Sequence, residues 1–388
     1  MKKNGIQTLV LVLFAALAAA LLCACSGEER PAAAEESATL INLNGSGAEI
    51  QGVGAAANGN IISIRAGGVY FVSGKLENGQ IIIDTGEAPA EVSLVLGGAE
   101  INCANDAAIY LRQAEKLRIR LEAGSENSIR SGREADMDSW DESRTGSALY
   151  AEDDVDIEGE GTLSILGLLN SGLICKDDLE IKGGNITVLA ANNGLRGSES
   201  VEIKGGTISV TAGNDGIKST SAKKEGKGYI RLSGGTVAVC AGGDGFSAET
   251  DLLIEGGSLF VSAEKDGLQA GPANSGLGRI DISGGTSHIN AGKRAVNARG
   301  TWLVSGGSIF ALCTEEQAGP ERGGQPFLLA SMESDAGDKL SVLSTGTVLA
   351  DAAADFPTNY VFYSSPELVS AGEYCLSNGK NEILSTAY

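Results

Sequence analysis

The stretch VEIKGGTISVTAGNDGIKS, residues 201–219, contains the pattern that decides the fold. On both sides of the Gly205-Gly206 pair, apolar residues alternate with polar ones, and a period of two is typical of strands that bury one face. The pattern returns in YIRLSGGTVAVCAGGDGFS, residues 229–247, and in LLIEGGSLFVSAEKDGLQ, residues 252–269. One structural unit is therefore repeated along the chain.

The Gly pairs give the length of this unit. They begin at Gly183, Gly205, Gly234, Gly256, Gly284 and Gly306. Their spacings of 22, 29, 22, 28 and 22 residues indicate a unit of 22, with insertions near Ser221–Gly228 and Pro272–Gly278. Such a unit is too short for a propeller blade and lacks the helical half of an ankyrin or TPR repeat. It matches one coil of a parallel β-helix, an all-β solenoid whose inward side chains stack into one core.

The repeat also predicts the division of the chain. Residues 60–127 look like more irregular coils, and residues 326–388 lose the repeat and gain Tyr and Phe. An uncovered solenoid end exposes strand edges that invite aggregation. We therefore predict a β-helix over residues 39–325 and a C-terminal cap over residues 326–388.

The N-terminus has the features of a targeting segment. Lys2 and Lys3 precede an apolar run that ends in the sequence LCAC, residues 22–25, which is similar to a bacterial lipobox. We expect residues 1–24 to be a lipoprotein signal peptide, Cys25 to be lipidated and residues 25–38 to be a polar tether. The protein would then lie in the cell envelope, anchored by lipid alone and facing the extracellular side or the periplasm. An ordinary secretory signal is the alternative.

Composition excludes several function classes. The chain has 388 residues, 55 of them Gly, and a net charge of −21, which argues against nucleic acid as a partner. A single His excludes metal sites that need two. Five cysteines follow the lipobox, and this odd number without a CxxC favours buried free thiols over a disulfide framework.

Acidic residues recur at equivalent positions of successive coils. One such column contains Asn193, Asp215, Asp244, Asp266 and Arg294. A second acidic set contains Asp153, Asp154, Asp177, Asp178, Glu199 and Asp251. Stacked carboxylates repel one another, and Ca²⁺, which prefers oxygen ligands, would remove that cost. The alternatives are turn-forming Asp-Gly and Asn-Gly dipeptides for the first column and a solvated face for the second set.

Basic residues accompany the first column. Arg196 and Lys218 are one period apart, and Lys176 and Lys265 are near them in the repeat. Together with a cation site, these side chains could hold an acidic sugar, whose carboxylate pairs well with Arg. The other interpretation is that they neutralise the Asp column itself.

Several motifs resemble a known family. GGVYFVSG (residues 67–74), LYAEDDV (149–155), GLICKDDL (172–179), NDGIK (214–218) and SSPEL (364–368) are similar to those of the β-helical carbohydrate-binding-domain lipoproteins, secreted bacterial proteins similar in shape to family-nine pectate lyases. The resemblance implies a right-handed parallel β-helix, bound Ca²⁺ and binding of cellulose or pectin-type polymers. Asp153, Asp154, Asp177, Asp178 and Asp215 match its motifs, whereas Asn193 and Arg294 depart from an acidic ladder.

Three functions fit these observations. The first, which we favour, is a non-catalytic surface lipoprotein that binds extracellular polysaccharide. The second is a pectate-lyase-like β-elimination enzyme that uses Ca²⁺ with Lys218 or Arg196 as the base, although nearby Asp residues would disfavour a neutral Lys. The third is an adhesin or envelope spacer without a sugar ligand. Flat solenoid faces also allow homo-oligomers.

Overall fold

The computed structural model describes residues 38–133, 146–222, 224–273 and 275–388, which form strands and turns. The predicted signal peptide, Cys25 and all but the last residue of the predicted tether lie outside the described residues. Within the described ranges, no helix has the length and apolar character needed to cross a membrane.

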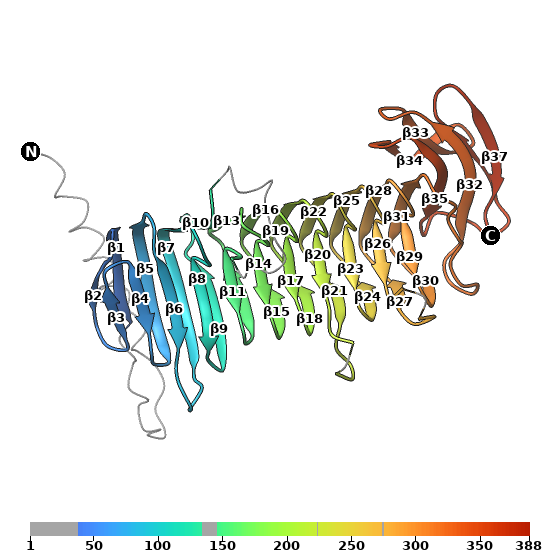
Figure 1. The fold of residues 1–388 in the computed structure, drawn as a ribbon. Helices are drawn as coiled ribbons and strands as arrows, with labels where there is room; N and C mark the ends of the chain where they lie inside the picture. The colour runs from blue at the N-terminus through green and yellow to red at the C-terminus, as the bar shows by residue number, and fades with distance from the viewer. Residues whose placement is uncertain (1–37, 134–145, 223, 274) are drawn as a thin grey trace, which may run out of the picture. The chain divides into compact units, whose positions relative to one another are not determined.

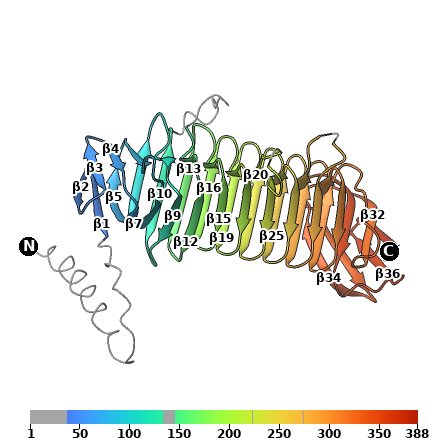
Figure 2. The same ribbon diagram turned by 90° about the horizontal axis from the view of Figure 1, so that it is seen from below.

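The described residues that precede the C-terminal cap are wound into a right-handed parallel β-helix, as predicted (Figure 1). A regular coil has three short strands, such as β17 (Leu195–Gly197), β18 (Ser200–Ile203) and β19 (Thr207–Ala212). Each strand pairs in parallel with the equivalent strand of the next coil, for example Val201 with Ile230. The coils therefore stack in register along one axis, and they form the row of strands in Figure 2.

Equivalent strands form three faces. The first face is an 11-stranded sheet of β3 (Ala55–Asn58), β4 (Ile61–Ile64), β6 (Gln80–Asp84), β8 (Ile109–Gln113), β11 (Leu149–Ala151), β14 (Leu173–Cys175), β17, β20 (Ile217–Ser219), β23 (Phe246–Ala248), β26 (Leu268–Ala270) and β29 (Val296–Ala298).

The second face contains β9 (Lys116–Leu121), β12 (Val155–Gly159), β15 (Asp178–Ile181), β18, β21 (Tyr229–Leu232), β24 (Asp251–Ile254), β27 (Arg279–Ile282) and β30 (Thr301–Val304). The third face contains β10 (Glu126–Ser131), β13 (Thr162–Gly167), β16 (Asn185–Ala190), β19, β22 (Thr236–Ala241), β25 (Ser258–Ala263), β28 (Thr286–Ala291) and β31 (Ser308–Cys313). The long strand β7 (Glu91–Cys103) pairs with both β9 and β10.

The core follows from the alternation in the sequence. In β19, Ile208, Val210 and Ala212 are buried, while the residues between them are exposed. Stacking such residues in every coil gives one continuous cluster. Full burial of each Val, Leu or Ile contributes about 1.5–3 kcal/mol, so the regular apolar positions explain why this sequence forms a solenoid.

The three corners have different chemistry. The Gly pairs lie between the second and third faces, and the second Gly of each pair has positive φ, such as +83° at Gly235. The Asn193 to Arg294 column lies between the third and first faces. The second acidic set lies between the first and second faces. The structure therefore separates the two predicted acidic clusters onto different edges of the solenoid.

Both ends of the solenoid are covered by antiparallel strands. At the N-terminal end, β1 (Thr39–Gly45) pairs with β2 (Ala48–Gln51), and β3 pairs with β4, two hairpins that the repeat did not predict. β1 also joins β5 (Gly68–Leu76) in parallel, and β5 joins β7. At the other end, β35 (Thr358–Ser364) pairs with β31 and with β32 (Phe327–Ser334).

The C-terminal cap has a small core of its own. Its sheet contains β34 (Thr347–Ala353), β33 (Lys339–Ser344), β36 (Glu373–Ser377) and β37 (Glu382–Thr386). Phe310 and Leu312, on the outer side of the last coil, pack into this second cluster. Trp302 and Phe362 close the solenoid core, with ring centroids 5.1 Å apart. The cap thus covers the edge that the repeat would leave open.

Candidate functional site

The first face presents one outward side chain from the middle of each short strand. Parallel register aligns these positions into a column, which contains Tyr110, Tyr150, Ile174, Arg196, Lys218, Ser247, Gln269 and Asn297. Neighbouring strands lie about 4.8 Å apart, so the column runs along the solenoid axis. Its basic and aromatic members are Tyr110, Tyr150, Arg196 and Lys218, with Ile174 between Tyr150 and Arg196, and together these five positions form a stripe.

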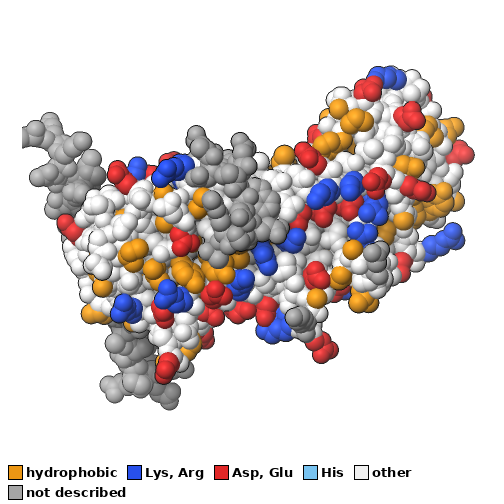
Figure 3. Space-filling model, viewed as in Figure 1, with side chains coloured by type: hydrophobic (Ala, Val, Ile, Leu, Met, Phe, Trp, Pro, Cys, Tyr) orange, Lys and Arg blue, Asp and Glu red, His pale blue; other side chains and the backbone are white. Residues whose placement is uncertain are grey.

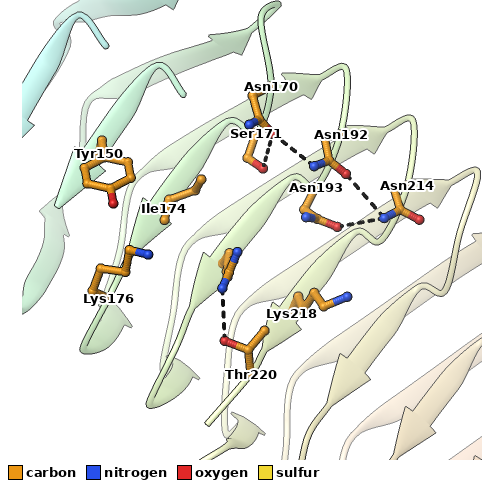
Figure 4. Close-up of a pocket in the computed structure, with 11 residues that line it drawn as sticks. Tyr150, Asn170, Ser171, Ile174, Lys176, Asn192, Asn193, Asn214, Lys218 and Thr220 are labelled. Atoms are coloured by element: carbon orange, nitrogen blue, oxygen red, sulfur yellow. Dashed lines mark hydrogen bonds between the residues drawn. The ribbon is translucent and has the colours of Figure 1, made fainter. Parts of the chain in front are cut away.

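A pocket of about 390 Å³ lies on this stripe. Figure 4 shows Tyr150, Ile174, Lys176 and Lys218 along the strands, with a row of Asn side chains on the adjacent corner turns. The pocket is lined by Tyr150, Asn170, Ser171, Ile174, Lys176, Asn192, Asn193, Arg196, Asn214, Lys218 and Thr220. The structure thus brings together three of the four predicted sugar-binding residues. Lys265, the fourth, lies on the corner between the third and first faces and does not line this pocket.

Arg196 carries a charge that no described carboxylate neutralises. Its Nη2 donates to the Thr220 hydroxyl at 3.3 Å, and its buried Nε has no hydrogen-bond partner in the described chain. No Asp or Glu of the described residues forms an ion pair with it. Burial accordingly lowers the pKa of the Arg196 guanidinium. An isolated, partly buried cation is costly, and an anion bound in the pocket would remove that cost.

The other two cations differ from Arg196. Lys218 forms a salt bridge with Asp215 at 2.6 Å, so the neutralisation considered as the alternative applies to this pair. Lys176 lies over the Tyr150 ring, 5.7 Å from its centroid. Burial raises the pKa of Tyr150 to about 12, so its hydroxyl keeps its proton and can donate a hydrogen bond.

Two aromatic residues of the stripe were missed by the sequence analysis. Tyr110 and Tyr150 meet edge to face at 5.5 Å, and Arg112 lies over the Tyr110 ring at 5.5 Å. Tyr110 is the second residue of β8 and Tyr150 is the middle residue of β11, and the two are in register with Arg196, which lies two coils after Tyr150. An insertion between the Tyr110 coil and the Tyr150 coil interrupts the 22-residue period, so counting by period could not align Tyr110 with Arg196.

The row of Asn side chains was also missed. Asn192 Nδ2 donates to Asn170 Oδ1 at 3.0 Å, and Asn214 Nδ2 donates to Asn192 Oδ1 at 3.3 Å. Their spacing of 22 residues was a signal in the sequence, since identical amides one coil apart can form a hydrogen-bonded ladder. These amides add polar groups to one wall of the pocket.

The acidic column is a ladder of side chain to backbone hydrogen bonds. Oδ1 of each member accepts the backbone N–H of the next member, at 3.2, 2.9, 3.0 and 3.2 Å. The acceptors are Asn193, Asp215, Asp244 and Asp266. This arrangement explains why Asn can replace Asp at the first step, because an amide oxygen accepts the same bond.

Charges in this column are compensated unevenly. Asp215 pairs with Lys218, and Asp266 pairs with Arg294 Nε at 3.3 Å. Asp244 forms no ion pair with any described residue. Burial, together with the charges of Asp215 and Asp266, raises the pKa of Asp244 to about 6. The carboxylate in the middle of the ladder is therefore the one that the protein disfavours at neutral pH.

We expect Asp244→Asn to stabilise the protein at pH 7.5. The folded state holds the Asp244 proton up to about pH 6, whereas the unfolded chain releases it near pH 4, so wild-type stability declines as pH rises through this window. Asn keeps the acceptor for Asp266 N–H and removes the charge. The free energy of unfolding in EDTA should be about 1–2 kcal/mol higher than wild type at pH 7.5, after allowance for solvent screening. The difference should vanish near pH 4, and equal urea midpoints at pH 7.5 would contradict this explanation.

The second acidic set is largely engaged by backbone and lysine donors. Asp153 accepts Ala114 N–H at 2.9 Å, and Asp154 accepts Asp178 N–H at 3.1 Å. Lys227, from the insertion at residues 221–228, bridges Asp178 and Glu199. Burial and neighbouring carboxylates raise the pKa values of Asp154 and Asp177. Figure 3 likewise shows Lys and Arg interspersed with Asp and Glu on this side of the molecule.

The carboxylate oxygens of the two acidic sets do not by themselves form a calcium coordination site. Ca²⁺ takes about six to eight oxygen ligands. In the described part of the chain, no group of three or more His, Cys, Asp or Glu residues is placed to hold a metal ion together. Several expected ligands instead accept backbone N–H groups or pair with Lys and Arg. Calcium binding at either acidic set therefore stays a prediction.

Comparisons with known proteins place the chain among carbohydrate-binding proteins. A family model described as carbohydrate-binding domain-containing protein matches residues 58–265 and 252–356, which together span more than half of the chain. A protein of the same description from Acetivibrio thermocellus is 35% identical over 129 residues. That match covers 33% of this chain and 45% of the relative, so the chain spans less than half of the relative's length.

A solved structure has the same fold. The polysaccharide lyase-like protein from C. thermocellum, determined as a gadolinium derivative, superposes with a TM-score of 0.55 at 30% sequence identity. The superposition covers 69% of this chain and 97% of that protein.

Proposed function

The chain belongs to the family of carbohydrate-binding domain-containing proteins, and from this premise we propose that the first-face pocket binds an acidic polysaccharide of polygalacturonate type without cleaving it. The main support for the proposal is the environment of Arg196. Its guanidinium is partly buried in the pocket and has no carboxylate partner among the described residues. A uronate carboxylate supplies the missing charge and can accept two N–H bonds from Arg.

The neighbours of Arg196 suit the rest of a sugar. Lys176 can pair with a second carboxylate along a polymer, since no described residue forms an ion pair with it. Tyr150 offers a ring face and a hydroxyl, the two features by which aromatic residues hold amphipathic ligands. The amides of Asn192 and Asn214 can exchange hydrogen bonds with sugar hydroxyls.

The shape of the site favours a chain over a single sugar. The stripe extends from the Tyr110 coil to the Lys218 coil, and a further pocket toward the N-terminus is lined by Arg65 and Arg112. A polymer lying along the solenoid axis would meet a charged or aromatic group at successive coils. This supports the pectin type over cellulose, which carries no charge to match Arg196.

The rival function is β-elimination with Lys218 or Arg196 as the base. Lys218 Nζ donates to Asp215 Oδ2 at 2.6 Å, so this amine is already engaged with a carboxylate of its own coil and is poorly placed to take a proton from a sugar. The description of the solved relative as lyase-like keeps this rival worth testing.

Retention on immobilised polysaccharide tests the proposal. The protein should be retained on polygalacturonate beads and eluted by salt, with less retention on cellulose. Absorbance of unsaturated products should stay flat throughout the incubation. Absorbance that grows and disappears in Lys218→Ala would establish the lyase, and lack of retention on polygalacturonate would overturn the proposal.

Calcium is a separate proposal, supported by the Asp244 carboxylate, which forms no ion pair with a described residue, and by the raised pKa values of Asp154 and Asp177. Adding Ca²⁺ to about 100 times its dissociation constant would stabilise the fold by about 2.7 kcal/mol. We therefore expect melting temperature to rise with Ca²⁺ and to fall back with EDTA. An unchanged melting temperature at 10 mM Ca²⁺ would contradict a structural ion.

The location of the protein is a further proposal, based on the sequence near Cys25. If Cys25 is lipidated, an alkyne-labelled fatty acid fed to the producing bacterium should label the wild-type protein, which should partition with membranes. Cys25→Ala should prevent both. A labelled Cys25→Ala protein would contradict lipidation at this residue.

A further inference from the structure

The third face carries a stacked pair of aromatic rings on its outer side. Phe260 on β25 and His288 on β28 are register partners, with ring centroids 5.4 Å apart and an angle of 6° between their planes. Phe260 is 45% exposed, although large apolar side chains are usually buried. This pair is therefore available to a ligand, on a face different from that of the Arg196 pocket.

One face of the Phe260 ring is left open by its neighbours. His288 covers the face toward the C-terminal coil. In the preceding coils the register partners are Ala238 and Ser209, whose side chains are too short to cover a ring. A cleft of about 260 Å³ results. The size of the cleft and the flat open face of Phe260 suit a ring that continues the His288–Phe260 stack.

The rest of the cleft is polar without being cationic. It is lined by Ser209, Val210, Thr211, Ala238, Val239, Cys240, Phe260, Val261, Ser262, His288, Asn290 and Asp355. No Lys or Arg appears among these residues. Burial lowers the pKa of His288, so its ring is neutral at pH 7.

The cap supplies the second wall of the cleft. Asp355 lies between β34 and β35, and its backbone N–H donates to Asn290 Oδ1 at 3.1 Å. This bond fixes an acidic side chain of the cap beside the outer surface of the third face. A carboxylate in this place repels anions and accepts hydrogen bonds from hydroxyl groups.

From this geometry we propose that the cleft binds a neutral pyranose residue of a polysaccharide. The apolar C–H face of the sugar stacks on the open face of Phe260, as the amphipathic character of aromatic contacts allows. Its hydroxyls bond to Asp355 and to the Asn290 amide. The chain then has two sugar sites of opposite preference, an acidic-sugar site on the first face and a neutral-sugar site on the third, and the second does not depend on the first.

Cys240 gives a direct readout, because it lines the cleft and is an exposed free thiol. The prediction of buried free thiols is confirmed for Cys175 and Cys313 and wrong for Cys240, which is exposed on the outward side of β22, while Cys103 and Cys375 are half-buried. Iodoacetamide labelling of the full chain can be followed by peptide mass spectrometry, with Cys103 and Cys375 as internal references. The probes are cellohexaose, xylohexaose, mannohexaose and an oligogalacturonate.

We expect at least one neutral hexaose to slow alkylation of Cys240 about threefold or more, the value for a site two-thirds occupied. Labelling of Cys103 and Cys375 should not change, and the oligogalacturonate should not protect Cys240. Phe260→Ala should abolish the protection and Phe260→Tyr should retain it, each compared with and without sugar in the same variant. Arg196→Ala should leave the protection of Cys240 by the neutral hexaose unchanged.

Protection of Cys240 by none of the neutral hexaoses would overturn the proposal. Equal protection in wild type and Phe260→Ala would do the same, because the sugar would then lie elsewhere. Loss of retention on polygalacturonate beads bears only on the Arg196 pocket, so failures of the two sites are distinguishable.

Discussion

Replacing Arg196 by alanine should weaken binding of oligogalacturonate by about 30-fold or more, the effect expected when one partner of a desolvated charge pair is removed. The loss should be large because the Arg196 guanidinium is partly buried and no described carboxylate pairs with it. The folded protein loses the 3.3 Å bond to Thr220 but also the cost of burying an uncompensated charge, so its melting temperature should not fall. Affinity is measured by isothermal titration at fixed ionic strength.

Two variants control this result. Arg196→Lys keeps the charge but loses the planar pair of donors, so it should recover only part of the affinity. Lys265→Ala removes one positive charge from a residue outside the pocket, and its affinity should stay within about twofold of wild type, since exposed and distant charges are screened. An equal loss in Arg196→Ala and Lys265→Ala would mean that the net charge of the protein, and not the pocket, governs binding.

The largest expected effect on stability is at a coil corner. Gly235→Ala should lower the free energy of unfolding by about 2–4 kcal/mol. A Cβ at Gly235 would lie 2.7 Å from Gly206 O and 2.8 Å from Gly205 C, both backbone atoms of the preceding coil. Because its φ is +83°, the added methyl also meets the strain of the left-handed region. Urea unfolding followed by circular dichroism measures the change.

Gly226→Ala separates the two causes. Gly226 has φ +72°, but an added Cβ there would meet nothing within 4 Å. Gly226→Ala should therefore lower the free energy of unfolding only through backbone strain, by about 1 kcal/mol. If both variants lose the same stability, close stacking of the corners contributes nothing, and the explanation of the paired glycines is wrong.

Local periodicity in the sequence was enough to predict the fold. Alternation such as Ile208 and Val210 inside, with polar residues between, gives strands, and the fixed spacing of the Gly pairs gives a stack of coils. The hairpins at the N-terminal end were not predicted because they depart from the repeat. Their antiparallel pairing depends on the need to cover an edge, which no single unit reveals.

The candidate site was predicted in part. Arg196, Lys218 and Lys176 come together because their positions in the repeat are equivalent or adjacent. The state of their charges was not predictable, since it depends on which carboxylate points at which cation: Asp215 reaches Lys218, and no described carboxylate pairs with Arg196. Likewise, spacing alone identified the acidic column but could not show that its oxygens accept backbone N–H groups of the next coil.

The central claim is that a carboxylate of the ligand neutralises Arg196, which no described carboxylate does, and methyl esterification tests it most directly. Isothermal titration of the wild-type protein compares an oligogalacturonate with the same oligomer fully methyl-esterified, in which shape and hydroxyls remain but the charges are gone. We predict affinity at least about tenfold weaker for the ester, equivalent to about 1.4 kcal/mol. We also predict that Arg196→Ala loses most of this preference for the acid and keeps only the part that Lys176 contributes. Equal affinity of the wild type for both oligomers would contradict the claim.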